Sequence, residues 1–330
     1  MKLIYKETSQ ETKTKMAEIA KNPEIANEID YETEAKSKIL AKTHHEYCEI
    51  VNSGNAAIMV AMNAMDGPII IPDQGTWHGF KQIAKFLSKE IITIKTDLGI
   101  INEEVLDNFS KEDPLILSNK NNKNSTLFLT SFAGYTAEQP IKEIANWCSE
   151  NNVTLVEDAS GSITDYKKKL ANGKYSDVIV ASTSKPKVIN VGDGGFITTN
   201  EDNFFEKSNL LLKIAKSNDI TKCGIGTEID FAESNLKKTL KATEYIKNNL
   251  DNIVHPDKRG TNVIIKNDDK DLAKNLRNEF DLGGKSIITK CPNYNRLKVK
   301  GVAIEIKNID TSSLTKENLD EIIDIIKVHI

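Results

Sequence analysis

Six short apolar segments constrain the fold of this chain more than any other feature of its sequence. They occupy residues 68–72, 90–96, 125–131, 153–159, 177–183 and 195–200. They are too short for helices, rich in Ile, Val and Thr, and bounded by Gly, Pro, Asn or Asp. Such segments are typical of strands that are buried on both faces of a mainly parallel sheet.

Helical patterns lie between several of these strands. Residues 55–65 are apolar almost all round, which predicts a deeply buried helix, whereas residues 80–90 and 140–152 are amphipathic. Strands that alternate with helices build an open sheet with helices on both of its faces. We therefore predict the α/β fold class with a mainly parallel central sheet.

The pattern changes after residue 200. A long lysine-rich helical pattern at 231–250 leads into shorter strand and helix patterns, and the last helix carries one apolar stripe. We expect three parts: a helical segment over residues 1–50 that packs on the large domain, a large α/β domain over 51–235, and a small C-terminal α/β domain over 236–330.

The composition argues against several classes of protein. Among 330 residues the formal net charge is −4 and the lysines are interspersed with acids, so we expect no nucleic-acid partner. No apolar run approaches the roughly 18 residues of a membrane helix, and no secretory signal is visible, so we predict a cytoplasmic protein. The 4 cysteines show no CxxC spacing, which argues against disulfides and a zinc site. We expect no metal.

Several polar residues fall where strands end, which is where ligands bind in an open α/β sheet. Asp158 and Ser182 end apolar segments, Gly54 and Asn55 open the buried helix, and Trp77 follows the first strand. Each has an ordinary explanation, such as a cap for Asp158 and Asn55 or a core position for Trp77. Together they also suit one ligand, with a helix start for a phosphate and a carboxylate for a cation.

The loop between the last two strands of this sheet carries two lysines. Lys185 and Lys187 precede the run GDGG, which begins at Gly192. One interpretation is a solvated loop, and the other is a reactive amine held over a cofactor.

These motifs, taken in order, resemble the DegT-type aminotransferases, a family of fold-type-I enzymes that use pyridoxal 5'-phosphate (PLP). The family patterns SGTxAL, an aromatic residue after Thr, EDAAQ, and SFHPxKxxxxGEGG correspond to SGNAA, TW, EDAS, and Ser-x4-Lys-x4-GDGG in this chain. The resemblance covers roughly residues 30–200. It implies a fold-type-I PLP-transferase-like architecture and transfer of an amino group from an amino-acid donor to a keto-sugar or similar carbonyl substrate.

The resemblance also assigns roles to particular residues. The lysine five places before the first glycine of GDGG is Lys187, which the resemblance implies forms the Schiff base with PLP. Asp158 would pair with the pyridinium nitrogen, and Trp77 would stack on the ring. Ser182 and the backbone of Gly54 and Asn55 would bind the phosphate. Enzymes of this fold type usually act as homodimers, so a homodimer is implied as well.

Some positions depart from the family, and other functions stay open. Gly161 stands where the family has Gln, and Ser184 and Lys185 stand where it has His-Pro. One alternative is a PLP-dependent lyase or sulfur-transfer enzyme, for which Cys223, expected in a loop, would be the residue to examine. Another is a non-catalytic PLP-binding homologue.

Overall fold

The computed structural model describes residues 1–24, 28–112, 125–293 and 297–330. Its centre is a seven-stranded sheet in which neighbouring strands β2, β3, β4, β7 and β8 are parallel. From one edge to the other the sheet runs β1 (Tyr47–Val51), β9 (Gly195–Thr199), β8 (Val178–Ser182), β7 (Thr154–Asp158), β4 (Thr126–Thr130), β2 (Ile69–Pro72) and β3 (Ile91–Ile94). The predicted mainly parallel α/β sheet is confirmed.

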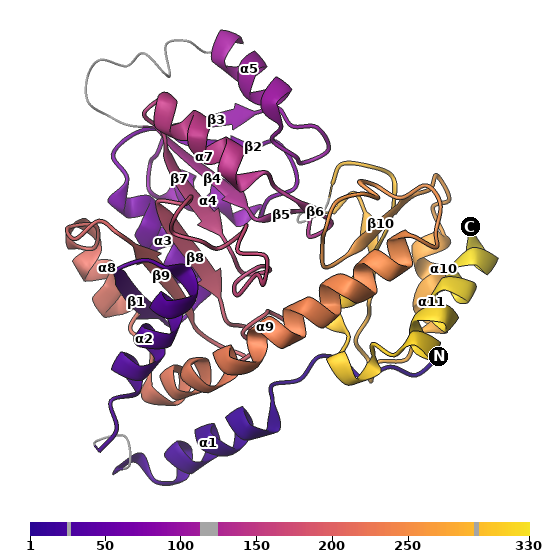
Figure 1. The fold of residues 1–330 in the computed structure, drawn as a ribbon, viewed down its shortest axis with the longest axis horizontal. Helices are drawn as coiled ribbons and strands as arrows, with labels where there is room; N and C mark the ends of the chain where they lie inside the picture. The colour runs from indigo at the N-terminus through magenta and orange to yellow at the C-terminus, as the bar shows by residue number, and fades with distance from the viewer. Residues whose placement is uncertain (25–27, 113–124, 294–296) are drawn as a thin grey trace.

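Helices cover both faces of this sheet (Figure 1). Alternate residues of a strand point to opposite faces, so in β7 Leu155 joins one apolar cluster and Val156 the other. The helices α3 (Gly54–Ala64) and α4 (Gly79–Phe86) contribute to the Val156 cluster. The helices α5 (Glu103–Glu112) and α7 (Ile141–Glu150) contribute to the Leu155 cluster. The helix α8 (Asn209–Ile214) lies beside α3.

The edge strand β1 was not predicted. The first fifty residues contain the helices α1 (Gln10–Lys21) and α2 (Tyr31–Thr43), but β1 begins at Tyr47 and pairs antiparallel with β9. A five-residue strand with one neighbour leaves too short an alternating pattern to be recognised. What defines β1 is therefore its partner strand.

The long helix α9 (Asp219–Lys247) begins twelve residues before the predicted start at 231. Its first turns contain Gly224 and Gly226, which favour a loop when the sequence is considered alone. In the structure these turns pack against the N-terminal helices: a Cβ on Gly224 would lie 2.8 Å from the Met16 sulfur, and one on Gly226 would lie 3.5 Å from Ala35. Close helix packing therefore outweighs the low helix propensity of glycine.

The C-terminal domain has its own antiparallel sheet and its own apolar core. The sheet order is β10 (Val263–Lys266), β12 (Gly301–Ile304) and β11 (Ile288–Cys291), covered by α10 (Leu272–Glu279) and α11 (Lys316–His329). Figure 1 shows α9 running from beneath the large sheet into this domain, where both termini lie. Leu3 belongs to the core of this domain, and the Leu3 amide donates to the carbonyl of Asp281 (2.9 Å). The predicted boundaries at residues 50 and 235 stay predictions.

A short hairpin of the large domain contacts residues 259–262, the segment that precedes β10. The hairpin consists of β5 (Phe132–Ala133) and β6 (Ala137–Glu138), which follow β4 directly. The amides of Thr261 and Asn262 both donate to the carbonyl of Tyr135, at 2.7 and 2.9 Å.

Among the described helices, none has the length and apolarity to cross a membrane.

Candidate functional site

Asp158 lies at the carboxyl end of β7, near the middle of the sheet. Its side chain is buried, and the amide and hydroxyl of Ser160 donate to Oδ1 at 3.0 and 2.6 Å. Burial raises the pKa of the Asp158 carboxyl, while the Ser160 hydrogen bonds and the positive charge of Lys187 oppose that rise. Within the described residues no donor reaches Oδ2. This oxygen is therefore available to a ligand.

The position of Asp158 is coupled to the next strand. The amide of Ser182, the last residue of β8, donates to the Ser160 hydroxyl oxygen at 2.9 Å. That hydroxyl in turn donates to Asp158, so one serine links the two strand ends. Sequence reasoning did not identify Ser160, although its place two residues after Asp158 is the spacing of a turn in which an Asp accepts from its own backbone.

Glu157 faces the other side of β7, as strand alternation requires. It is fully buried and accepts hydrogen bonds from the hydroxyls of Ser131 and Ser176 (both 2.6 Å) and from the amide of Ala171 (2.8 Å). Burial raises the pKa of its carboxyl, and these three donors oppose the rise. Glu157 is thus a structural acid, and only Asp158 faces the site.

Gly54 begins α3 directly beside Ser182. A Cβ added to Gly54 would lie 2.4 Å from the Ser182 Cβ, so only glycine allows the helix start to approach β8 this closely. Ser53 caps the helix by accepting a hydrogen bond from the Ala56 amide (3.2 Å). The first-turn amides, which include those of Gly54 and Asn55, have no partner within the helix. Next to the Ser182 hydroxyl they form a cradle suited to a phosphate.

The two lysines of the loop after β8 lie in different environments. The Lys187 ammonium donates to the Tyr135 hydroxyl at 3.0 Å and lies 5.3 Å from the centre of that ring. The Lys185 side chain is 42% exposed and lies near Glu7, with 3.9 Å between ammonium and carboxylate. Lys187 therefore faces the same site as Asp158, whereas Lys185 faces solvent. Tyr135 was not identified from the sequence, because nothing local marks a tyrosine in a turn as a partner of a distant lysine.

The Trp77 side chain lies over the start of α4, the helix that follows it. A Cβ on Gly79 would lie 2.1–2.3 Å from three carbons of the indole ring, so the ring lies directly over that glycine. The ring also meets Phe80 edge-on, with centroids 5.9 Å apart. The stacking role assigned to Trp77 by resemblance stays a prediction.

Cys223 lies in α9 rather than in the predicted loop. Its side chain is buried, and burial raises the pKa of the thiol. A reactive thiol needs a lowered pKa instead.

No metal-binding group of three or more His, Cys, Asp or Glu side chains occurs within the described part of the chain.

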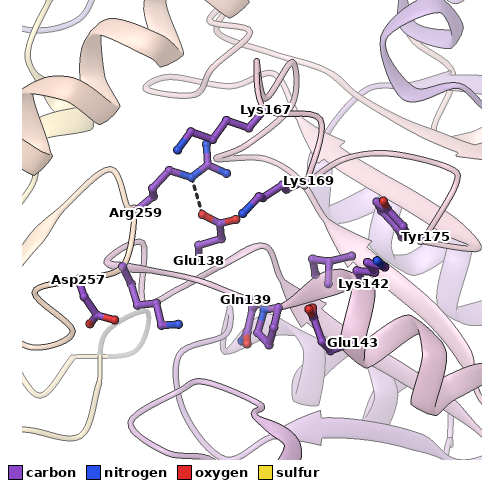
Figure 2. Close-up of a pocket in the computed structure, with 12 residues that line it drawn as sticks. Glu138, Gln139, Lys142, Glu143, Lys167, Lys169, Tyr175, Asp257 and Arg259 are labelled. Atoms are coloured by element: carbon purple, nitrogen blue, oxygen red, sulfur yellow. Dashed lines mark hydrogen bonds and ion pairs between the residues drawn. The ribbon is translucent and has the colours of Figure 1, made fainter.

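A cavity of about 480 Å³ lies between the β6–α7 turn and the loop that contains Arg259. Figure 2 shows Arg259 directed at Glu138, with Lys167 and Lys169 nearby. The Arg259 guanidinium also bonds both carboxylate oxygens of Asp165, at 2.8 and 3.0 Å. Because two carboxylates already hold this guanidinium, and because neither Lys187 nor Asp158 lines the cavity, we interpret it as an ion-paired domain contact.

Comparison with known families decides the identity of the large domain. The family model described as DegT/DnrJ/EryC1/StrS aminotransferase family matches residues 6–229 of the 330. The chain belongs to this family. A second family model, the MJ1341 family C-terminal domain, matches residues 233–327.

Several solved structures share the fold of this chain. A serine palmitoyltransferase from S. paucimobilis with bound PLP and myriocin is 12% identical, with a TM-score of 0.75, over 100% of this chain and 87% of that one. A DegT/DnrJ/EryC1/StrS aminotransferase from Brucella abortus is 13% identical, with a TM-score of 0.69, over 96% and 95%. An alanine–glyoxylate aminotransferase from Nostoc sp. is 17% identical, with a TM-score of 0.64, over 90% and 86%. At these identities the likeness shows the fold alone.

The groups present in this DegT-family chain suit PLP chemically. The open oxygen of Asp158 can accept a hydrogen bond from a protonated ring nitrogen. Position 54 has no room for a side chain, so the backbone amides at the start of α3 lie directly beside the Ser182 hydroxyl. Amides and a hydroxyl are the donors that a phosphate requires. The Lys187 amine belongs to the same edge of the sheet. A carboxylate, an anion cradle and an amine are the three groups that this cofactor needs.

Proposed function

We propose that this chain is a PLP-dependent aminotransferase that moves an amino group from an amino-acid donor to a keto-sugar or similar carbonyl substrate. One observation carries the proposal: Lys187 lines one pocket with Ser160, whose hydroxyl donates to the buried Asp158 carboxylate at 2.6 Å. Family membership supports PLP as the cofactor. When bound, PLP supplies an electron sink for the electrons left at the substrate carbon.

The chain's own residues would hold the cofactor at both ends. Asp158 would keep the ring nitrogen protonated, because a buried carboxylate stabilises a positive charge beside it. Ser182 and the first-turn amides at Gly54 and Asn55 would bind the phosphate. Trp77 would stack on the ring.

Lys187 would carry the proton transfers. Its amine would hold the cofactor by condensing with the aldehyde, with loss of water, and the amino substrate would take its place and release it as a free amine. The free amine would then take a proton from the substrate Cα and deliver it to the cofactor C4′. The Tyr135 hydroxyl, 3.0 Å from the Lys187 nitrogen, would orient the amine during these steps. A homodimer, as is usual for enzymes of this fold type, and a cytoplasmic location remain part of the proposal.

A sulfur-transfer reaction through Cys223 has less physical support. The thiol is buried in α9 and its pKa is raised, which keeps it protonated and weakly nucleophilic. A non-catalytic PLP-binding homologue would keep the Lys187 bond to the cofactor without turnover.

The site assignment is tested by borohydride reduction of PLP-treated protein, followed by peptide mass mapping. We expect one pyridoxyl group, on Lys187, and none in the Lys187→Ala variant. Lys185→Ala is the matched control and should be labelled like the wild type. Labelling of Lys185, or of no lysine, would overturn the assignment.

The reaction class is tested separately with amino donors. An aminotransferase should convert bound PLP to the amine form with at least one amino acid, followed by absorbance spectroscopy. Conversion should be lost in Lys187→Ala. Labelling at Lys187 without conversion by any donor would favour the non-catalytic homologue.

A further inference from the structure

Three lysines from different parts of the chain converge near Tyr135. Lys187 belongs to the large domain, Lys307 to the C-terminal domain, and Lys6 to the N-terminal segment. The Lys187 and Lys307 ammonium groups lie 5.3 and 5.0 Å from the centre of the Tyr135 ring. All four residues line one narrow pocket with about 10 Å³ of free volume, which is the room of about one water.

Lys6 has an unusual environment within this pocket. Its side chain is 6% exposed, and within the described residues its ammonium has no hydrogen-bond or ion-pair partner. Glu228 and Asp310 are the acids that act on it, but Glu228 is already bound by the Ser9 amide and the Thr12 hydroxyl (2.7 Å). Burial and the charge of Lys187 lower the pKa of Lys6 to about 8. A buried cation without a partner is costly unless an anion accompanies it.

A second polar group in the same pocket is without a partner. The Thr261 hydroxyl is buried and makes no hydrogen bond to any described residue. Thr261 lines the pocket, and its carbonyl accepts from the Lys307 amide at 3.0 Å. A hydroxyl donor beside a buried ammonium is the pair of groups that an oxyanion requires.

The acids around the pocket do not cancel the charge of Lys6. Glu305 pairs with Lys307 and also accepts from the Thr289 hydroxyl (2.6 Å). Asp158 is the acid that faces Lys187. Asp310, the other acid that acts on Lys6, accepts from the amide and hydroxyl of Ser312, at 3.0 and 2.7 Å. None of these acids forms an ion pair with Lys6 within the described residues.

We propose that this pocket binds an oxyanion group of the substrate, a carboxylate or a phosphate, through Lys6, Thr261 and Lys307 beside Tyr135. The site would select carbonyl substrates that carry such a group over neutral ones. The free volume of about 10 Å³ accommodates one oxygen of such a group in place of a water. That the anion belongs to the substrate rests on the proposed function, whereas the anion site itself rests on Lys6 and Thr261.

The test measures binding of two small probes, acetate and methyl phosphate, by calorimetry at constant ionic strength, with chloride as the reference anion. PLP-loaded protein is used, because its phosphate cradle is then filled. If no PLP binds, the Gly54→Val variant serves instead, since a side chain there blocks the cradle. We expect one site that prefers one of the two probes to chloride, and that preference identifies the carboxylate or phosphate source.

Variants then locate the site. Lys6→Met and Lys307→Met should each weaken binding at least tenfold, and Thr261→Val should weaken it severalfold while changing no charge. Lys185→Met is the matched control, because Lys185 is exposed, and should bind like the wild type. The bound probe should also protect Lys6 from acetylation by acetic anhydride, read by mass mapping.

Two outcomes overturn the anion site: neither probe binds better than chloride, or Lys6→Met and Thr261→Val both bind like the wild type. The proposed function fails separately. Pyridoxyl labelling of Lys187 without anion binding removes only this inference, and anion binding without labelling removes only the cofactor assignment.

Discussion

Replacement of Lys247 tests how the domains hold the site together. Lys247 is the last residue of α9, and its buried ammonium donates to the carbonyls of Thr136, His255 and Lys258 at 2.7, 2.8 and 2.8 Å. Thr136 belongs to the hairpin turn that contains Tyr135. The ammonium thus joins that turn to the loop after α9.

The size of the effect follows from which carbonyls stay buried in Lys247→Met. Thr136 is fully buried, so its carbonyl is left without a donor, whereas His255 is half-buried and Lys258 exposed, so theirs can turn to water. A buried carbonyl that loses its hydrogen-bond donor lowers the free energy of unfolding by about 1–3 kcal/mol. Removing a buried charge offsets part of this loss, so we expect the free energy of unfolding to fall by about 2 kcal/mol.

Two measurements check this expectation. For a chain of 330 residues a loss of about 2 kcal/mol lowers Tm by roughly 3 °C. Hydrogen exchange should also speed up at the amides of Glu138 and Thr261, which bond Arg259 and Tyr135 across the same contact (both 2.7 Å). Lys241→Met, an exposed change on the same helix, is the control. Unchanged Tm and exchange in Lys247→Met would refute the reasoning.

Two further predictions concern the large domain. Gly54→Val should lower PLP affinity at least tenfold in a fluorescence titration, because a Cβ there would lie 2.4 Å from the Ser182 Cβ, whereas Gly226→Ala, with ordinary contacts at 3.5 Å, should leave it unchanged. Burial lowers the pKa of His45 from 6.5 to about 4. As the pH falls from 6.5 to 4, this imidazole is therefore protonated in the unfolded chain before it is protonated in the folded one, and the free energy of unfolding decreases. The full loss is about 3 kcal/mol; urea midpoints at pH 7 and pH 4.5 should differ less in His45→Asn, and an equal difference would contradict the assignment.

Much of the large domain was predictable from local patterns. The six expected strand segments all contain strands, because strands buried on both faces leave continuous runs of Ile, Val and Thr. The buried helix begins at Gly54, one residue before its expected start. β1 and the first turns of α9 were missed, since pairing and close packing decide them.

The candidate site divides in the same way. Asp158, Ser182 and Lys187 lie at strand ends or follow a fixed spacing, so the order of motifs along the chain was enough to select them. Whether they perform the roles assigned by resemblance stays a prediction. Lys6 and Lys307 carry no such mark, because a solvated lysine and a buried one look identical in a sequence.

Local pattern and spacing thus determined six strands of the sheet, the helices between them and the group of residues at the sheet edge, because short-range rules of burial and alternation act within a few residues. Only the folded chain decided that Lys187 rather than Lys185 meets Tyr135, and that residues 6 and 307 reach the same pocket. Contacts between segments about 300 residues apart are set by how the domains pack, which no local pattern encodes.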